Sequence, residues 1–105
     1  KGIETAPVNI VFISSKVELG GLVFELQDYA AVAEHIWLAA TALGYATVWT
    51  DGETALEGKA EAIGKLLGVP EDRTVRAVMP VGIPLTAGKQ QEKRPLSDFV
   101  HYEAH

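Results

Sequence analysis

The alternation of apolar and polar positions predicts three β-strands. Residues 8–13 (VNIVFI) are rich in β-branched side chains, which favours a buried strand followed by a loop at residues 14–16. Residues 45–50 (YATVWT) alternate strand-forming side chains over the length of a short strand. Residues 74–81 (TVRAVMPV) form the third strand. Pro80 within it favours an edge position or a strand end, because proline cannot donate a ladder hydrogen bond.

The longest apolar segment, residues 28–43, predicts a helix, because twelve of its sixteen residues are apolar and alanine is frequent. Asp28 suits an N-cap or a first helical turn, and Gly44 suits the left-handed position that ends a helix. Apolar side chains cover almost the whole circumference, so we expect the helix to be central or buried against a partner chain. Its main apolar face is expected to comprise Tyr29, Val32, Ile36, Ala39, Ala40 and Leu43.

A second helix is predicted over residues 57–67, ending at Gly68. It is amphipathic, and two internal glycines weaken it. Its apolar face is expected to comprise Ala60, Ile63, Leu66 and Leu67.

The remainder of the chain predicts a polar tail. Residues 82–94 hold glycine, proline and a KQQEKR run, which are typical of a loop. In residues 96–102, Phe99 and Val100 are apolar side chains that could anchor the tail to a sheet.

Length and composition restrict the classes of function. The 105 residues are expected to form a single domain, residues 1–105, and 48% hydrophobic residues suffice for a folded core. A net charge of -5 disfavours nucleic acid as a partner. The absence of cysteine excludes disulfides and a thiolate nucleophile. No apolar run approaches the roughly 20 residues of a membrane span and no secretory signal is visible, so a cytoplasmic location is expected. The chain starts with Lys1 rather than methionine and is expected to be a piece of something longer.

Two clusters could bind a ligand. Lys89, Lys93 and Arg94 fall within six residues, where they could bind a phosphate, or they could be solvated and paired with Glu92 or Asp98.

The second cluster, Thr50-Asp51-Gly52, follows a predicted strand. Its backbone N–H groups could meet a flat ligand, because glycine permits close approach, and Trp49 could wall the pocket. The alternatives are a simple connecting turn with Asp51 as an Asx or N-cap residue, and Trp49 as core.

No other chemical motif stands out. His35 is expected to be a buried, hydrogen-bonded histidine, and His101 and His105 make no metal pattern. The sequence holds no phosphate-binding glycine-rich motif and no nucleophile elbow.

The order and spacing of the segments resemble the C-terminal half of the FMN-dependent nitroreductase superfamily. Residues 28–44 resemble its apolar central helix and closing glycine, and residues 93–102 (KRPLSDFVHY) resemble its tail. The other matching segments are Ala6-Pro7-Val8 with the strand behind it, and residues 45–52, 62–70 and 75–84. The resemblance implies an α+β nitroreductase-like fold, with a central β-sheet flanked by helices, in an intertwined homodimer.

The resemblance also implies an FMN-binding role for named residues. The backbone amides of Asp51 and Gly52, beside Trp49 and Thr50, would face the N5 and O4 edge of the flavin, and Lys93 and Arg94 would reach its phosphate. The implied enzyme takes hydride from NAD(P)H through flavin N5 and passes it to a nitroaromatic, a quinone or a similar small acceptor. No catalytic side chain is implied, because the flavin performs the chemistry.

Two departures from the family pattern keep an alternative open. The family's N-terminal Arg-Ser-x-Arg segment has no counterpart ahead of Lys1, and Glu34-His35 stand where the family's central helix carries Gln-Asn. The alternative is a truncated dimer-core module with weak or no flavin binding and no catalysis. A specialised branch of the superfamily, such as flavin destruction or dehalogenation, is a third possibility.

Overall fold

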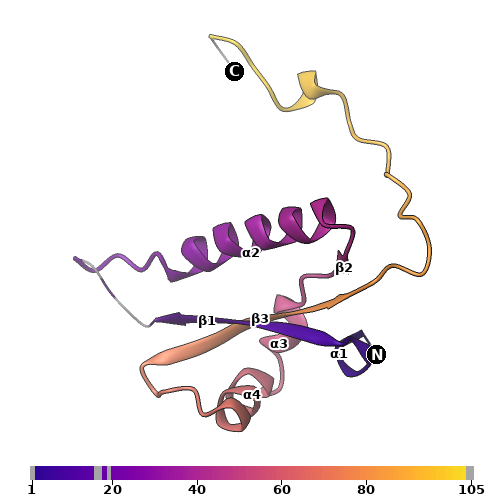
Figure 1. Cartoon of the computed structure of the whole chain (residues 1–105). Coiled ribbons are helices and arrows are strands. Elements are labelled where there is room, and N and C mark those ends of the chain that lie inside the picture. Colours follow the sequence, from indigo (N-terminus) through magenta and orange to yellow (C-terminus); the bar gives the residue numbers. More distant parts are fainter. Residues whose placement is uncertain (1, 16–17, 19, 104–105) are drawn as a thin grey trace.

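A three-stranded antiparallel sheet of order β1-β3-β2 forms the centre of the molecule, with helix α2 on one side and helix α4 on the other (Figure 1). The computed structural model describes residues 2–15, 18 and 20–103. The elements in chain order are α1 (Gly2–Thr5), β1 (Val8–Ser15), α2 (Glu25–Ala42), β2 (Ala46–Thr47), α3 (Asp51–Thr54), α4 (Lys59–Leu67), β3 (Arg73–Gly82) and the 3-10 turn η1 (Leu96–Asp98). This arrangement is the predicted α+β class, and α1 was not predicted.

Strand β1 confirms the first predicted strand and continues past it. Ser14 and Ser15 pair with Thr74 and Arg73, so the loop predicted for these two residues is wrong. Lys16 lies outside the described residues. Strand β1 extends past the β-branched run because β3 is long enough to supply backbone partners beyond residue 13.

A bulge in β3 changes which side of the sheet its residues face. The pairing passes from Phe12↔Ala77 to Ile13↔Val75 and skips Arg76. Ala77 joins the core beneath α2, whereas Val75 lies on the α4 side, where a Cβ built on Gly64 would be 3.8 Å from Val75 Cγ2. The extra residue thereby directs Arg76 to the α2 side of the sheet.

Strand β3 is the central strand, so the predicted edge position for Pro80 is wrong. The alternative prediction, a strand end, fits better, because β3 ends two residues later at Gly82. The Val78 carbonyl points toward Thr50. Pro80 is two residues further along the strand, so its backbone groups point to the same side. The N–H that proline lacks would therefore point toward the segment between Thr47 and Thr50, which is not a continuous strand.

Helix α2 starts three residues earlier than predicted, and Asp28 lies in its first turn. Its end is as predicted: Gly44 has φ 82°, its N–H bonds to Thr41 O, and the N–H of Tyr45 bonds to Ala40 O at 2.8 Å. These two bonds form a Schellman motif, which satisfies carbonyls of the last turn.

The predicted apolar face of α2 is wrong in part. The face on the sheet carries Tyr29, Ala33, Ile36 and Ala40, spaced as neighbours on one side of a helix. Val32 and Leu43 fall outside that stripe and are 52% and 73% exposed. The small alanines are the buried residues because the helix lies close to the sheet, so several large side chains face outward.

The predicted strand at residues 45–50 is mostly irregular. Only Ala46 and Thr47 pair with β3, and Thr50 forms a separate bridge with Val78. Between them the chain leaves the sheet because Trp49 packs against aromatic rings of α2. The predicted Asp51-Gly52 turn is also wrong, because these residues begin α3.

Helix α4 is confirmed but begins two residues later than predicted. Glu57 and Gly58 have φ values of 57° and 71°, which a right-handed helix does not allow. Gly68 ends the helix with φ 66°, as predicted. Leu66 and Leu67 are exposed rather than buried, since the side toward β3 carries Ala60, Ile63 and Gly64 instead.

The tail after Gly82 is the predicted loop, and it runs away from the sheet and helices (Figure 1). The radius of gyration is 17.0 Å, whereas a compact chain of this length has about 13 Å. Phe99 is 55% exposed and does not anchor the tail to the sheet, contrary to expectation. Its ring instead lies under the Arg94 guanidinium, 4.2 Å from the centroid. In the part of the chain that the structure describes, no helix is both long and apolar enough to cross a membrane.

Candidate functional site

Thr50 fixes the chain at the point where the predicted ligand-binding segment begins. Its N–H donates to Val78 O at 3.3 Å, and its hydroxyl donates to the same carbonyl. Its own carbonyl accepts the hydroxyl of the buried Thr54, one turn later. Thr50 thus connects central strand β3 to α3 and holds Asp51 and Gly52 at a defined place beside the sheet.

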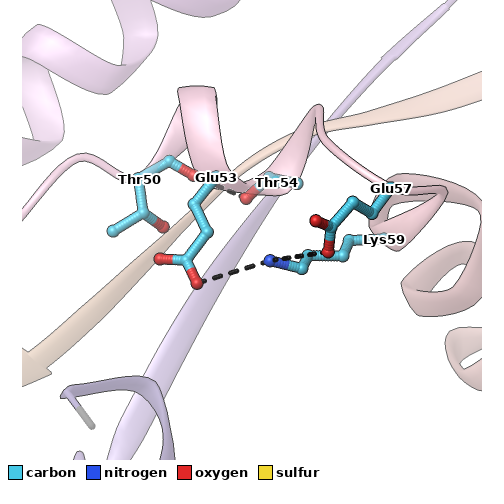
Figure 2. Close-up of polar contacts among 5 residues, drawn as sticks. All are labelled: Thr50, Glu53, Thr54, Glu57 and Lys59. Carbon is cyan, nitrogen blue, oxygen red and sulfur yellow. Dashed lines mark hydrogen bonds and ion pairs between the residues drawn. The ribbon is translucent and has the colours of Figure 1, made fainter.

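The far end of α3 is held by an exposed ion-pair group (Figure 2). Lys59 Nζ lies 3.5 Å from Glu53 Oε1 and 4.0 Å from Glu57 Oε2. These contacts join α3 to the start of α4. Because all three side chains are solvated, the ion pairs add little to stability, roughly 0 to 1 kcal/mol.

The Asp51 carboxylate has two hydrogen-bond donors. The hydroxyl of Tyr29 donates to Oδ2 at 3.3 Å, and the backbone N–H of Gly52 donates to Oδ1 at 2.7 Å. Burial, and next the Asp51 carboxylate, raise the pKa of Tyr29 above its ordinary value of 10.0, since both disfavour the phenolate. Tyr29 therefore stays a neutral donor over the physiological pH range.

Aromatic rings form one wall of this corner. The rings of Tyr29 and Trp49 meet edge to face at 5.9 Å between centroids, and Trp37 lies 6.5 Å from Trp49. Among the described residues, the buried indole Nε1 of Trp49 has no hydrogen-bond partner. The Trp49 side chain lowers the pKa of Tyr29 and so opposes part of its rise. Trp49 is therefore a partly buried residue packed against the core under α2, and it stands two residues before Asp51 in the chain.

Gly52 faces open space. Apart from its chain neighbours and the backbone of its own helix, no atom of the described residues lies within 4 Å of a Cβ added to it. Room thus exists beside its backbone, as a flat ligand would require, although its N–H is engaged by Asp51. Gly52 has no positive φ, so the residue provides room rather than an unusual conformation.

The structure does not bring the predicted cations to this corner. Lys93 and Arg94 are exposed and lie on the tail, which leaves the body of the chain (Figure 1). Within the described ranges neither forms an ion pair with Glu92 or Asp98, so that alternative is not seen. The two predicted parts of the site are separate within one copy.

Histidines contribute little to the arrangement. His35 Nδ1 lies 2.7 Å from Ala31 O, so it is hydrogen-bonded as predicted, but it is exposed rather than buried. It faces outward because the sheet lies under the Tyr29 side of α2. His105 lies outside the described residues.

Sequence reasoning missed two features near the site. One is the hydrogen bond from Tyr29 to Asp51, which joins residues 22 positions apart and gives no local signal. The other is an open cavity of about 490 Å³ between β1 and the N-terminal part of α2. Its lining is mainly apolar and includes Phe12, Ile13, Leu22, Phe24, Tyr29 and Val32.

Comparison with known proteins identifies the family of the chain. A model of the nitroreductase family matches residues 1–83. The chain belongs to the nitroreductase family. It is 37% identical over 84 residues to a Methanothermobacter thermautotrophicus protein provisionally named NADH dehydrogenase/NAD(P)H nitroreductase, an alignment covering 78% of this chain and 42% of that protein.

Solved structures show the same fold. A Bacteroides thetaiotaomicron protein with the same provisional name superposes with a TM-score of 0.76 at 26% identity, covering 95% of this chain and 56% of that one. A nitroreductase family protein from Clostridium novyi NT gives 0.67 at 30% identity, covering 79% and 46%. This member of the nitroreductase family thus spans about half the length of the relatives it matches.

Proposed function

We propose that this chain is part of an FMN-dependent NAD(P)H oxidoreductase that reduces nitroaromatic, quinone or similar organic acceptors. Membership of the nitroreductase family supports an oxidoreductase role. The observation that carries the proposal is the open backbone at Gly52, beside Trp49 and fixed to the central strand through Thr50. A flat ring needs such an accessible edge of backbone.

The corner offers open space for a ring edge at Gly52, but Lys93 and Arg94 lie on the tail of the same copy, away from this corner. Trp49, Thr50, Asp51 and Gly52 would hold the ring edge, with the backbone N–H groups of Asp51 and Gly52 as donors. FMN, when bound, supplies hydride transfer between the nicotinamide and the acceptor. The chain's own task is to offer those donors and an accessible face. For Gly52 this requires that its N–H exchange Asp51 Oδ1 for the ligand.

We assign the phosphate to Lys93 and Arg94 of a second copy. Both lie on an extended tail that makes no packed layer with its own sheet (Figure 1). Two cations suit a phosphate monoester, because arginine binds two oxygens at once and lysine adds a mobile charge. In this arrangement each ligand is bound by two subunits.

The exposed apolar surface supports a homodimer. On α2 the side chains of Leu26, Val32 and Leu38 are exposed, and so are Ile83, Leu85 and Leu96 of the tail. Exposure of so many large side chains on a small chain is typical of an interaction surface. We propose that two α2 helices meet there and that the tails cross to the other subunit.

The direct test is flavin uptake by the purified chain. We expect titration with FMN to give a saturable change in the flavin absorbance spectrum and a dimer in sedimentation. Addition of NADH or NADPH should bleach the bound flavin, and a quinone or nitroaromatic should restore the colour. A colourless protein that takes up no FMN at dimer-forming concentrations would overturn the proposal.

A second candidate, a dimer-core module without flavin, has its own supporting observation. In the structure the Gly52 N–H already donates to the Asp51 carboxylate, which puts a negative charge beside the backbone edge that a ring would need. This candidate predicts a stable dimer that neither binds FMN nor changes its melting temperature when FMN is added. The same titration therefore separates the two functions.

A further inference from the structure

Tyr29 and Asp51 connect the main helix to the proposed ring-edge site. Tyr29 lies in the first part of α2, and its ring is fixed between Phe12 of β1 and Trp49, at centroid distances of 6.5 Å and 5.9 Å. Its hydroxyl donates to Asp51 Oδ2 at 3.3 Å. A side chain packed on two sides has little rotational freedom, so the position of its hydroxyl is well defined.

The carboxylate that Tyr29 contacts is a net negative charge beside the Gly52 backbone. Its other oxygen accepts the Gly52 N–H at 2.7 Å. Among residues 2–15, 18 and 20–103, no lysine or arginine forms an ion pair with Asp51. Both of its donors are neutral groups, so the charge of the carboxylate is dispersed but not neutralised.

We propose that Tyr29 is a positioning residue for the flavin edge: it holds the Asp51 carboxylate beside Gly52, and this charge weakens binding of reduced flavin relative to oxidised flavin. The inference rests on the proposed function. A reduced flavin carries more negative charge than an oxidised one, and a nearby carboxylate repels that charge. The Tyr29 hydroxyl sustains this effect, because its hydrogen bond keeps the carboxylate in place.

Two substitutions should therefore both raise the relative affinity for reduced flavin, to different extents. Asp51→Asn keeps the shape and an oxygen for the Gly52 N–H but removes the charge. We expect the ratio of FMN affinities, reduced over oxidised, to rise about tenfold, which corresponds to about 30 mV for a two-electron couple. Tyr29→Phe keeps the ring packing but no longer holds the carboxylate, and the ratio should rise by about two- to threefold. The readout is the reduction potential of FMN bound to the full chain.

Matched controls are available for both substitutions. Tyr45→Phe removes a hydroxyl from a half-exposed tyrosine beyond the end of α2, and Glu61→Gln removes an exposed negative charge on α4. Neither residue belongs to the proposed site, and both variants should keep the wild-type potential. A lower ratio in Asp51→Asn, or an unchanged potential in Tyr29→Phe, would overturn the inference.

A measurement without FMN separates this inference from the proposed function. In nitrogen-15 NMR spectra of the flavin-free chain, the Gly52 amide should exchange slowly with solvent. The protection should fall about tenfold in Asp51→Ala and by a smaller factor in Tyr29→Phe, with no change in Tyr45→Phe. If the Gly52 amide is protected from exchange as expected but no variant takes up FMN, the proposed function and the charge effect are both contradicted. FMN uptake with a Gly52 amide insensitive to Tyr29 contradicts only the positioning role.

Discussion

Arg76, in the middle of β3, forms an ion pair with Glu25, the first residue of α2. Its Nε also donates to Ser14 Oγ of β1 at 2.8 Å. The guanidinium therefore joins three elements at one point, and the bulge that skips residue 76 is what directs it there. Side chains of Arg76 and Glu25 are only 22% and 14% exposed, so the pair is largely removed from water.

Loss of Arg76 should be costly. Arg76→Ala leaves the Glu25 carboxylate shielded from water without a counter-charge, and we expect the free energy of unfolding to fall by about 2 to 3 kcal/mol. The double variant Arg76→Met with Glu25→Gln should lose less, because no unpaired charge remains. Urea unfolding measures both. Arg73→Ala is the control, since Arg73 only reaches Ser15 Oγ at 3.5 Å on the exposed surface.

Tyr29 should make stability depend on alkaline pH. Burial and the Asp51 carboxylate raise its pKa in the folded state above the ordinary 10.0, so the unfolded chain releases the proton first as pH rises. The stabilisation is complete below about pH 10 and is lost as the pH rises through the folded-state pKa. Tyr29→Phe should flatten the fall in unfolding free energy between about pH 9 and pH 11. An unchanged slope would contradict this assignment.

Gly52→Val tests the proposed place of the ring. Its side chain would extend into open space, so we expect the melting temperature to stay within about 3 °C of wild type. FMN affinity should fall at least tenfold, because the added methyl groups occupy the volume beside the backbone. Ala62→Val on the exposed side of α4 controls for a β-branched residue in a helix. Full flavin retention in Gly52→Val would mean that the ring lies elsewhere.

The tail cations are tested by Lys93→Ala combined with Arg94→Ala. If they bind the phosphate, FMN affinity should fall about tenfold or more. The wild-type affinity should decrease with added salt more steeply than that of the variant, because two charge contacts are lost. Lys65→Ala, an exposed cation on α4, should have no effect. Mixed dimers of this tail variant with Gly52→Val would contain one intact site if the tail binds in the other subunit, and none if it binds in its own.

Local patterns predicted those elements whose formation depends on nearby residues. The β-branched run at β1 and the alanine-rich segment of α2 with Gly44 behind it were confirmed, because strand propensity, helix propensity and the left-handed cap act within a few residues. The boundaries at Ser15 and Lys59 were missed. They depend on how far β3 extends as a partner and on two left-handed residues before α4.

Features that depend on residues far apart in the sequence were harder to predict from local patterns. Val32 was expected on the apolar face of α2, yet the position of the sheet decides which side is covered, and that side favours Ala33. The predicted strand fails at Trp49 because its ring packs on Tyr29, twenty positions away. For the site, Asp51 and Gly52 were predicted as ligand-binding residues, but the hydrogen bond from Tyr29 gave no local signal. Their assignment to FMN stays a prediction.

The stretch from Gly82 to Arg94 spans twelve peptide units, enough for a reach of about 40 Å when extended, against a longest molecular dimension of 46 Å. An arm of that length can deliver its charges almost a full protein width from the strand where it departs. If the arm binds in the other subunit, a substitution at its end would impair the site of the neighbouring chain and leave the site of its own chain intact.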